Sequence, residues 1–598
     1  MIKFSVKTMT VMVLLFAIIS AMVCTVSSES LQSSNKITET LSSVMLKATQ
    51  ETERIPVRIR LTDDMAEELC QEAIHSLIKQ SKTLSTNTVL NIDSLSAQDI
   101  NEYISVKRQA TASVYSNINH DFSNQYLKDE DIIYTCKYVP IIIAELTVSD
   151  INELKYNDKI SSIDYYSYLV GKHDIADQSS EFSQEQVRSN NQYNTVTQVP
   201  TARQTFNVSG SGVTIGILDV GNLNINHGNI TYMDVECRYS TEDVPINNHP
   251  TTVAAILYSI APDAQYYYTT HMKVVDNEEY LISNTTIENE IEWLIDNGSN
   301  IINMSMALYE EYGDNHNTYG VFSQLLDEIS NNTNVTFVKS AGNDGAAGIT
   351  SGGMANNIIT VGNYDDKMTT TYDDDEIEDS SSYYACQGID DDICLYKPDI
   401  CAPASHITLG YADNGCGTSY AAPQISGIAA LMMQKDASLK AAPEDVKAIL
   451  TASVNMETPH HYKPVGTSLQ NYKMYGAGLV NAYNALTVTS NEQFYSSYLF
   501  TSTSEKTHTI NITSDMIGKT LRISLAYLKH HSHNLPNVNL SLESSSGMSV
   551  SRSESLANNV EIMEYVPTSA GVYTIIVEKF GIYSNSNIYY CVAWDCTD

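Results

Sequence analysis

The chain has 598 residues, with 34 Lys and Arg against 71 Asp and Glu, which gives a formal net charge of -37 at pH 7. Its length accommodates several domains, or fewer where one of them is a large α/β unit. The negative charge excludes nucleic acid and anionic membranes as expected partners and favours a protein that stays dispersed in water.

The N-terminus carries a short apolar segment. Lys3 and Lys7 precede an apolar run that ends near Cys24, and small polar residues follow it. The run is shorter than the roughly 20 residues that a membrane span requires. We therefore expect a signal peptide at residues 1–28 and a secreted, extracellular protein that has no membrane contact after signal removal. A membrane anchor is the alternative interpretation.

The ten cysteines give no metal-binding pattern, because none has zinc-finger spacing. In the segment after residue 170 their number is odd, so disulfide pairing there is incomplete or intermolecular. Two pairs are close in sequence: Cys386 with Cys394, and Cys591 with Cys596.

Residues 29–170 contain two similar patterns, "IPVRIRLTDDMAEEL" at 55–69 and "VPIIIAELTVSDINEL" at 139–154. In each, a β-rich run leads through a threonine into a helical pattern. A helical stretch at about 98–126 lies between them, and 160–166 supplies a further strand. We expect a small α+β unit here, followed by a polar linker at residues 171–194.

Residues 195–490 alternate short apolar runs with helical patterns. The expected strands are "GVTIGILD" at 212–219, "DAQYYYT" at 263–269, "SNIINMSM" at 299–306, "NVTFVKSAGN" at 334–343 and "NNIITVGN" at 356–363. Alternation of this kind predicts an α/β fold, a parallel sheet with helices on both faces. Functional groups in such sheets gather at the carboxyl ends of the strands.

Residues 491–598 have a different pattern, without the helical segments of the preceding region. Runs such as "KTLRISLAYL", "NVNLSLES" and "GVYTIIVEKFG" are β-rich, partly alternating, and separated by turn-forming residues. They predict a C-terminal antiparallel β-sandwich.

Four polar residues occupy strand ends or helix starts in the α/β segment. Asp219 ends "GVTIGILD", His249 opens "HPTTVAAILYSIAPDA", Asn343 ends "FVKSAGN", and Ser419 opens "TSYAAPQISGIAALMM". A serine hydroxyl attacks a carbonyl when a base takes its proton, an acid orients the base, and donors stabilise the oxyanion. These residue types supply all four parts. Each alone has a simpler explanation, such as a helix cap for Ser419 or a turn former for Asn343.

Together these motifs resemble the subtilisin-like serine proteases, the subtilases. The segment "GTSYAAP" matches the family's Gly-Thr-Ser-x-Ala-x-Pro motif, "KPDICAPA" at 397–404 resembles the stretch before the nucleophile, and "NIINMSM" and "SAGNDG" match the substrate-binding strand and the oxyanion segment. The order Asp, His, Ser is the subtilisin order. The resemblance implies a secreted serine endopeptidase that cuts protein or peptide substrates through an acyl-enzyme intermediate.

The resemblance also implies roles for individual residues. His249 would take the proton of Ser419, and Asp219 would hold the imidazole in its tautomer and orientation. The side-chain amide of Asn343 and the backbone N–H of Ser419 would form the oxyanion hole.

For the substrate, the resemblance implies binding by Ser305, Met306, Ala307 and Gly342. The first three would pair with an extended peptide through backbone hydrogen bonds. Ala307 stands where the family usually has glycine, which predicts a narrower pocket for the residue before the cut bond.

The histidine motif departs from the family pattern. The family usually has His-Gly-Thr-His-Val-Ala, whereas this chain has "HPTTVA", with Pro250 and Thr252 in place of glycine and the second histidine. Pro250 at the first helical position is compatible with a helix. His227 is a rival to His249, but it follows Asp219 closely and begins no helical pattern. The departure also supports an alternative function, a catalytically impaired secreted binding protein on a subtilase scaffold.

The flanking segments fit the same resemblance. Residues 29–170 resemble the inhibitory prosegment of subtilases, so the chain's own prosegment is an expected partner and inhibitor, removed by self-processing. The family needs no cofactor for its chemistry. A structural calcium ion is compatible with the acidic stretch that begins "YDDDEIED" at 372, although this stretch has no EF-hand spacing. The cluster His530, His531 and His533 is a weaker metal candidate.

Overall fold

The computed structural model describes seventeen segments of the chain. They are residues 36–48, 50–62, 66–81, 84, 95–166, 170–172, 192–275, 278–281, 286–309, 316–384, 397–411, 415–456, 472–500, 502–530, 535–555, 558–580 and 587–597. The expected signal peptide and most of the expected linker lie outside these residues.

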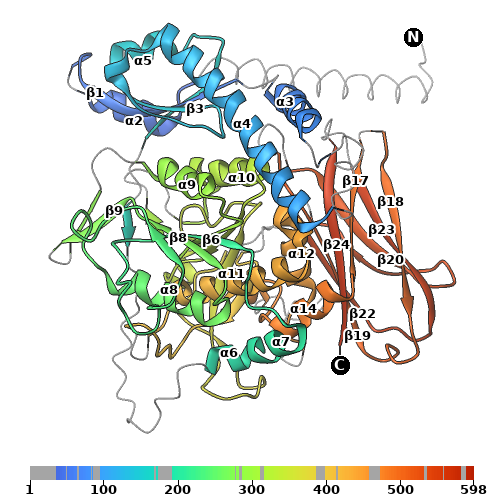
Figure 1. Ribbon diagram of the computed structural model, residues 1–598. Coiled ribbons are helices and arrows are strands. Elements are labelled where there is room, and N and C mark those ends of the chain that lie inside the picture. The colour runs from blue at the N-terminus through green and yellow to red at the C-terminus, as the bar shows by residue number, and fades with distance from the viewer. Residues whose placement is uncertain are drawn as a thin grey trace, which may run out of the picture. The chain divides into compact units, whose positions relative to one another are not determined.

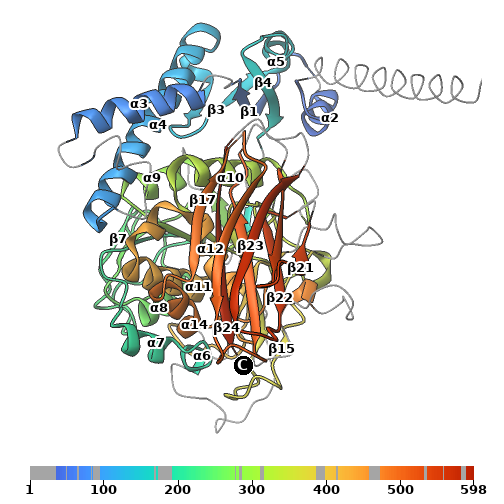
Figure 2. The ribbon, with the colours of Figure 1, turned by 90° about the vertical axis from the view of Figure 1, so that its right-hand side faces the viewer.

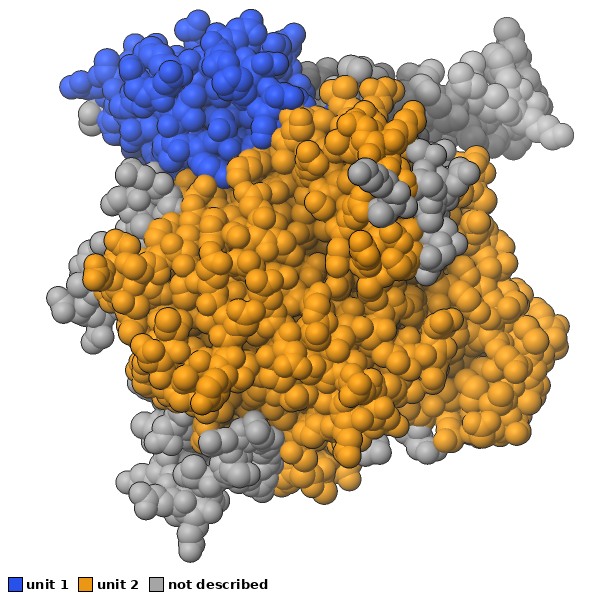
Figure 3. Space-filling model, viewed as in Figure 1, with its two compact units in different colours: residues 1–67, 115–136, 140–167 blue, residues 68–114, 137–139, 168–598 orange. Residues whose placement is uncertain are grey.

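The chain divides into two compact units, coloured separately in Figure 3. Unit 1 comprises residues 1–67, 115–136 and 140–167, and unit 2 comprises residues 68–114, 137–139 and 168–598. The expected prosegment is therefore shared between the units. Its residues 68–114 group with the larger unit, which the sequence did not predict.

Unit 1 has the expected α+β architecture. Its antiparallel sheet has the order β2 (Ile132–Thr135), β3 (Ile141–Thr147), β1 (Arg54–Leu61), β4 (Ile160–Tyr165), and it carries the helices α2 (Glu39–Lys47) and α5 (Val148–Leu154). The helix α5 begins at a capping box, in which Thr147 and Asp150 each bond the other's backbone N–H. Apolar residues of β1, β3 and β4, such as Val57, Ile142 and Ile163, form its core.

The main sheet of unit 2 is the predicted parallel sheet. Its strands in spatial order are β15 (Glu376–Ile377), β14 (Ile359–Asp365), β13 (Thr336–Ser340), β11 (Ile301–Met304), β6 (Thr214–Leu218), β8 (Gln265–Thr269) and β7 (Val235–Cys237), and β16 (Ile400–Pro403) also pairs with β14. All pairs are parallel except β14 with β15. The central strands are buried on both faces, which explains their continuous apolar sequences.

Helices cover both faces of this sheet (Figure 1). The helices α8 (Asn248–Ile260) and α11 (Thr418–Lys435) pack against each other on one face, and α9 (Ile287–Asp296) and α10 (Val321–Thr333) lie on the other. The helix α11 is buried along almost its whole length, so it forms the centre of the largest core cluster. This fold confirms the α/β prediction.

The helix α4 (Ala97–Tyr126) belongs to both units, residues 97–114 to unit 2 and the rest to unit 1. Two cations from its first half contact other parts of unit 2. The Arg108 guanidinium donates to the carbonyl of Ser299 (2.7 Å), shortly after the end of α9, and to that of Thr333 (3.0 Å), the last residue of α10. Lys107 donates to the Asn331 carbonyl at 2.8 Å. Cations at helix C-termini complement the helix dipole, so these contacts fix the first half of α4 within unit 2.

The C-terminal region forms the predicted antiparallel sandwich (Figure 2). One sheet has the order β17 (Phe494–Leu499), β24 (Ile588–Thr597), β19 (Thr520–Tyr527), β22 (Val560–Tyr565), and the other β18 (Glu505–Ile512), β23 (Gly571–Phe580), β20 (Asn537–Glu543), β21 (Ser549–Ser553). The first sheet packs on α12 (Pro443–Ala452). There, buried Arg522 bonds the carbonyls of Thr451 and Ala477.

No disulfide joins any two of the seven cysteines that the structure describes. The near pair Cys591 and Cys596 is not a disulfide, because both residues belong to the single strand β24. Cys386 and Cys394 lie outside the described residues. None of the helices that the structure describes is long and apolar enough to cross a membrane.

Candidate active site

Asp219 follows the central strand β6 and is fully buried. Its Oδ1 accepts hydrogen bonds from the backbone N–H of Val220 (2.7 Å) and from Nδ1 of His249 (2.9 Å). Its Oδ2 has no hydrogen-bond partner among the residues that the structure describes. The hydrogen bond from the Val220 N–H therefore orients the Asp219 carboxylate toward the imidazole of His249.

His249 is the second residue of α8 and is 2% exposed. Asn247 caps the helix, and its side-chain oxygen accepts from the His249 N–H at 2.8 Å. The helix begins at Asn248, so Pro250 is its third residue rather than its first, which corrects the sequence expectation. Pro250 still lies in the first turn, where backbone N–H groups have no intrahelical acceptor, so the helix is undisturbed.

Ser419 is the second residue of α11, and Gly417 turns the chain into that helix with φ of 147°. The next residue, Tyr420, stacks on His249, with ring centroids 5.7 Å apart and 30° between the rings. Tyr420 is buried, and burial, followed by the charge of Asp219, raises its pKa. The start of α11 thus lies directly beside the imidazole.

Asn343 follows β13 and faces the same helix start. Its side-chain oxygen accepts two hydrogen bonds from Thr418, one from the backbone N–H and one from Oγ1, each at 2.9 Å. The Thr418 hydroxyl in turn accepts from the Gly342 N–H at 3.2 Å. With the oxygen end of the Asn343 amide held in this way, the nitrogen end is directed away from Thr418.

The expected substrate residues lie at the next strand end. Ser305 and Met306 follow β11, and Ala307 begins the short strand β12 (Ala307–Tyr309); all three are buried. Gly342 has φ of +108°, and a Cβ at this position would lie 2.5 Å from Cγ2 of Thr350. Glycine is required here both by the backbone conformation and by the close approach of Thr350.

The rival histidine is placed elsewhere. The ring of His227 packs against Tyr411 with centroids 4.5 Å apart, and its Nδ1 accepts from the Asn229 N–H at 3.3 Å. The structure therefore joins Asp219 to His249 and gives His227 different partners.

Three residues near the site were given no role by the sequence interpretation. Thr418 orients Asn343, and Tyr420 covers the imidazole. Thr252, which replaces the family's second histidine, donates from its hydroxyl to the Asn248 carbonyl at 3.1 Å and accepts from the Tyr411 N–H at 3.0 Å. The sequence motif includes Thr418, but nothing in the sequence indicates that Thr418 bonds Asn343.

The acidic stretch holds one carboxyl group suited to a cation. Asp375 is 1% exposed, and neither of its carboxylate oxygens has a hydrogen-bond partner among the described residues. Burial and the charges of Asp366 and Asp374 raise its pKa to about 8. Within the part of the chain that the structure describes, no three His, Cys, Asp or Glu side chains are arranged to hold a metal ion. His530 is described, but His531 and His533 lie outside the described residues.

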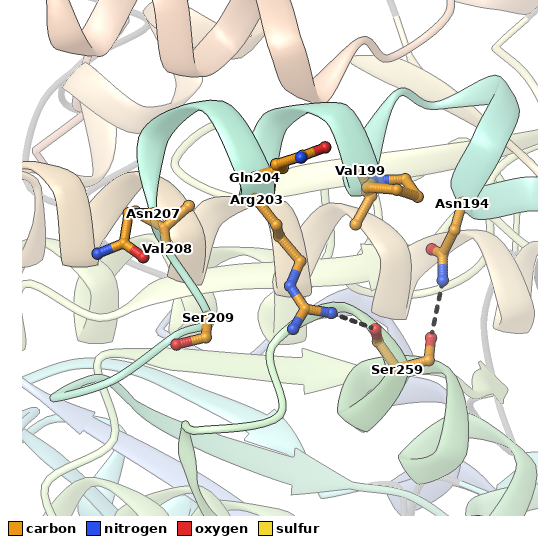
Figure 4. Close-up of a pocket in the computed structure, with 9 residues that line it drawn as sticks. Asn194, Val199, Arg203, Gln204, Asn207, Val208, Ser209 and Ser259 are labelled. Carbon is orange, nitrogen blue, oxygen red and sulfur yellow. Dashed lines mark hydrogen bonds between the residues drawn. The ribbon is translucent and has the colours of Figure 1, made fainter.

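A cavity of about 470 Å³ lies apart from these residues, beside α7 (Val199–Phe206) (Figure 4). Arg203 and Asn194 both reach toward Ser259 there, with hydrogen bonds of 3.2 Å to its carbonyl and its hydroxyl. None of the predicted site residues lines this cavity.

Part of the chain matches a known protein family. Residues 210–478 match the subtilase family. M-protease of Shouchella clausii is 26% identical over 369 residues, and the match covers 59% of this chain and 80% of that protein. Subtilisin Savinase of Lederbergia lenta is 28% identical over 292 residues, and the match covers 46% of this chain and 91% of that protein. The solved structure of the epidermin leader peptide processing serine protease from Staphylococcus aureus is 15% identical, covers 73% of this chain and 98% of that one, and has a TM-score of 0.43. Residues 210–478 therefore form a subtilase domain, and the chain is a serine endopeptidase.

Proposed function

We propose that Asp219, His249 and Ser419 form the catalytic triad. The hydrogen bond of 2.9 Å between Asp219 Oδ1 and His249 Nδ1 is the observation that carries the proposal, because it places a proton on Nδ1 and leaves Nε2 as the base. The stacking of Tyr420 on His249 supports it, since this contact brings the residue after Ser419 against the imidazole.

In the proposed reaction, each of these residues has one role. Nε2 of His249 takes the hydroxyl proton while Ser419 Oγ attacks the carbonyl carbon of the substrate peptide bond. The negative oxygen that results is stabilised by Nδ2 of Asn343 and by the Ser419 N–H. His249 then protonates the leaving amine, and water releases the acyl group by the reverse sequence. None of these steps requires a cofactor.

The prosegment is part of the proposal. Residues 170–172 form β5 (Val170–Lys172), which pairs antiparallel with β12, Lys172 opposite Ala307 and Val170 opposite Tyr309. A strand from the end of the prosegment thus occupies the edge where the substrate is expected to pair, which supports an inhibitory role. Arg108 and Lys107 of α4 support it as well, since they hold another part of this segment to the catalytic unit.

The zone of processing can be narrowed to residues 173–191. β5 ends at Lys172, whereas Tyr193 is already buried in the catalytic core, where its hydroxyl bonds Ser259 Oγ at 2.7 Å. A cut between these points would separate the prosegment at 29–170 from the catalytic domain at about 195–490 without opening the core. The sandwich at 491–598 would remain attached through α12.

Secretion and a structural calcium ion complete the proposal. The apolar N-terminus supports export, with removal of residues 1–28. Asp375 is the described carboxylate best suited to a structural cation, because its buried oxygens lack hydrogen-bond partners among the described residues. Calcium would stabilise the fold at this position and take no part in the reaction.

The test is N-terminal sequencing of the secreted protein from wild type and from Ser419→Ala side by side. Wild type should begin within or just after residues 173–191, and the variant should keep its prosegment. A variant that matures like wild type would contradict self-processing. If neither protein is processed and mature wild type made by an added protease cleaves no peptide, the alternative of a non-catalytic binding protein on this scaffold gains support.

A further inference from the structure

A fully buried lysine lies close to the proposed substrate site and is not used by the mechanism. Lys339 belongs to β13, four residues before Asn343, and is 0% exposed. Its neighbours in the strand, Val338 and Ser340, are apolar or small. Burial of an ammonium group is unfavourable, so a lysine in this position calls for a structural or functional reason.

The contacts of Lys339 place its charge beneath the substrate strand. Nζ donates to the carbonyls of Ser340 (3.1 Å) and Met306 (3.2 Å) and to Oγ1 of Thr350 (3.3 Å). All three of these acceptors are neutral oxygens, two carbonyls and one hydroxyl. Met306 is the middle residue of the proposed substrate segment, so the cation lies directly behind that segment.

Thr350 connects the lysine to segment 341–343, which lies beside the proposed substrate segment. Its methyl group lies so close to Gly342 that a Cβ on that glycine would approach it to 2.5 Å, and its N–H donates to the Ala341 carbonyl at 3.0 Å. Gly342 precedes the proposed oxyanion residue Asn343. Thr350 therefore contacts segment 341–343, and the Lys339 ammonium bonds both the Thr350 hydroxyl and the Met306 carbonyl of segment 305–307.

We propose that Lys339 selects substrates with aspartate or glutamate immediately before the cut bond. This inference depends on the proposed function, because it assumes that a substrate pairs with residues 305–307 and points that side chain between residues 305–307 and 341–343, toward Thr350. A carboxylate there would replace the Thr350 hydroxyl, the longest of the three contacts, as acceptor from Nζ. The Thr350 hydroxyl could then donate to the second carboxylate oxygen.

The sequence of the processing zone agrees with this selectivity. Residues 173–191 contain Asp174, Asp177, Glu181 and Glu185. A protease that cuts its own precursor after an acidic residue therefore has candidate bonds in this zone, the first of them two residues beyond the end of β5.

The test compares peptide substrates that differ only in the residue before the cut bond, Glu against Gln and Asp against Asn. For wild type, kcat/KM should be about 10- to 100-fold higher for the acid than for its amide, the range of a charge-assisted hydrogen bond. Lys339→Met keeps the length of the side chain and should bring the ratio close to one. Lys447→Met removes another buried lysine, one that pairs with Asp399 at 2.9 Å, and should leave the ratio unchanged.

Each protein is also labelled with a fluorophosphonate probe. This probe has no side chain that corresponds to the residue before the cut bond, so its reaction does not depend on Lys339. A wild type that labels but shows a ratio near one, or a Lys339→Met that labels and keeps the wild-type ratio, would overturn the inference and leave the proposed function standing. A mature wild type that does not label overturns both. Should Lys339→Met not fold, the wild-type ratio and the N-terminus of the mature protein decide: a new N-terminus that follows a neutral residue contradicts the inference.

Discussion

Thr418 offers a specific test of how the oxyanion site is built. Its N–H and hydroxyl both bond the side-chain oxygen of Asn343, and its hydroxyl accepts from the Gly342 N–H. Thr418→Val keeps the shape of the side chain and removes the two hydroxyl contacts. Each hydrogen bond contributes about 1 kcal/mol, so the variant loses about 2 kcal/mol of the free energy that holds the oxyanion site in place. We therefore expect kcat to fall about 30-fold.

Because Asn343 acts on the charge that develops in the transition state, KM should change little. The matched control is Thr418→Ser, which retains the hydroxyl and should stay within about threefold of wild type. The assay is steady-state kinetics on a peptide anilide, with active-site titration to count folded enzyme. Equal kcat for Thr418→Val and wild type, or equal damage in Thr418→Ser, would refute the reasoning.

Three further predictions concern the base, the prosegment and pH. Asp219→Asn should lower kcat about 10⁴-fold, because an amide no longer fixes the tautomer of His249; a loss below about tenfold would count against the triad. Arg108→Met in a prosegment added in trans should weaken inhibition about tenfold or more, since the helix-end carbonyls lose their cation, while the exposed Lys79→Met should inhibit like wild type. Asp375→Asn should stabilise the protein at pH 8, measured by denaturant unfolding in the inactive Ser419 variant with calcium removed. A pKa raised from near 4 to about 8 corresponds to about 5 kcal/mol at this pH, which solvent screening reduces to a few kcal/mol. The raised pKa of Asp375, about 8, means that this carboxyl lowers stability as pH rises from its unfolded value near 4, so the two proteins should unfold alike near pH 4; a constant difference would contradict this assignment.

The sequence predicted the sheet well because its strands have strong local signals. The runs before Asp219 and Asn343 are largely apolar, and helical patterns separate most such runs. This pattern predicted both the parallel pairing of the strands and the position of the polar residues at the carboxyl edge of the sheet. The pairing of Asp219 with His249 came from the resemblance to subtilases, since spacing alone left His227 as a rival.

Other features depend on contacts between distant segments and had no local signal. The strand β5 has three residues and pairs with β12, which lies far away along the chain, and no periodicity reveals such a pair. Residues 68–114 resemble ordinary amphipathic helices, and only tertiary contacts such as those of Arg108 assign them to the catalytic unit. Lys339 was included in an apolar strand, because the sequence does not show which oxygens surround its ammonium group.

The central claim is that Ser419 is the nucleophile and His249 its base. The most direct measurement is mass spectrometry of the mature protein after reaction with a fluorophosphonate, with His249→Ala and Ser419→Ala treated in parallel. The proposed triad predicts one phosphonylated peptide, modified at Ser419, with labelling strongly slowed in His249→Ala and absent in Ser419→Ala. Modification at another residue, or undiminished labelling without the histidine, would contradict it.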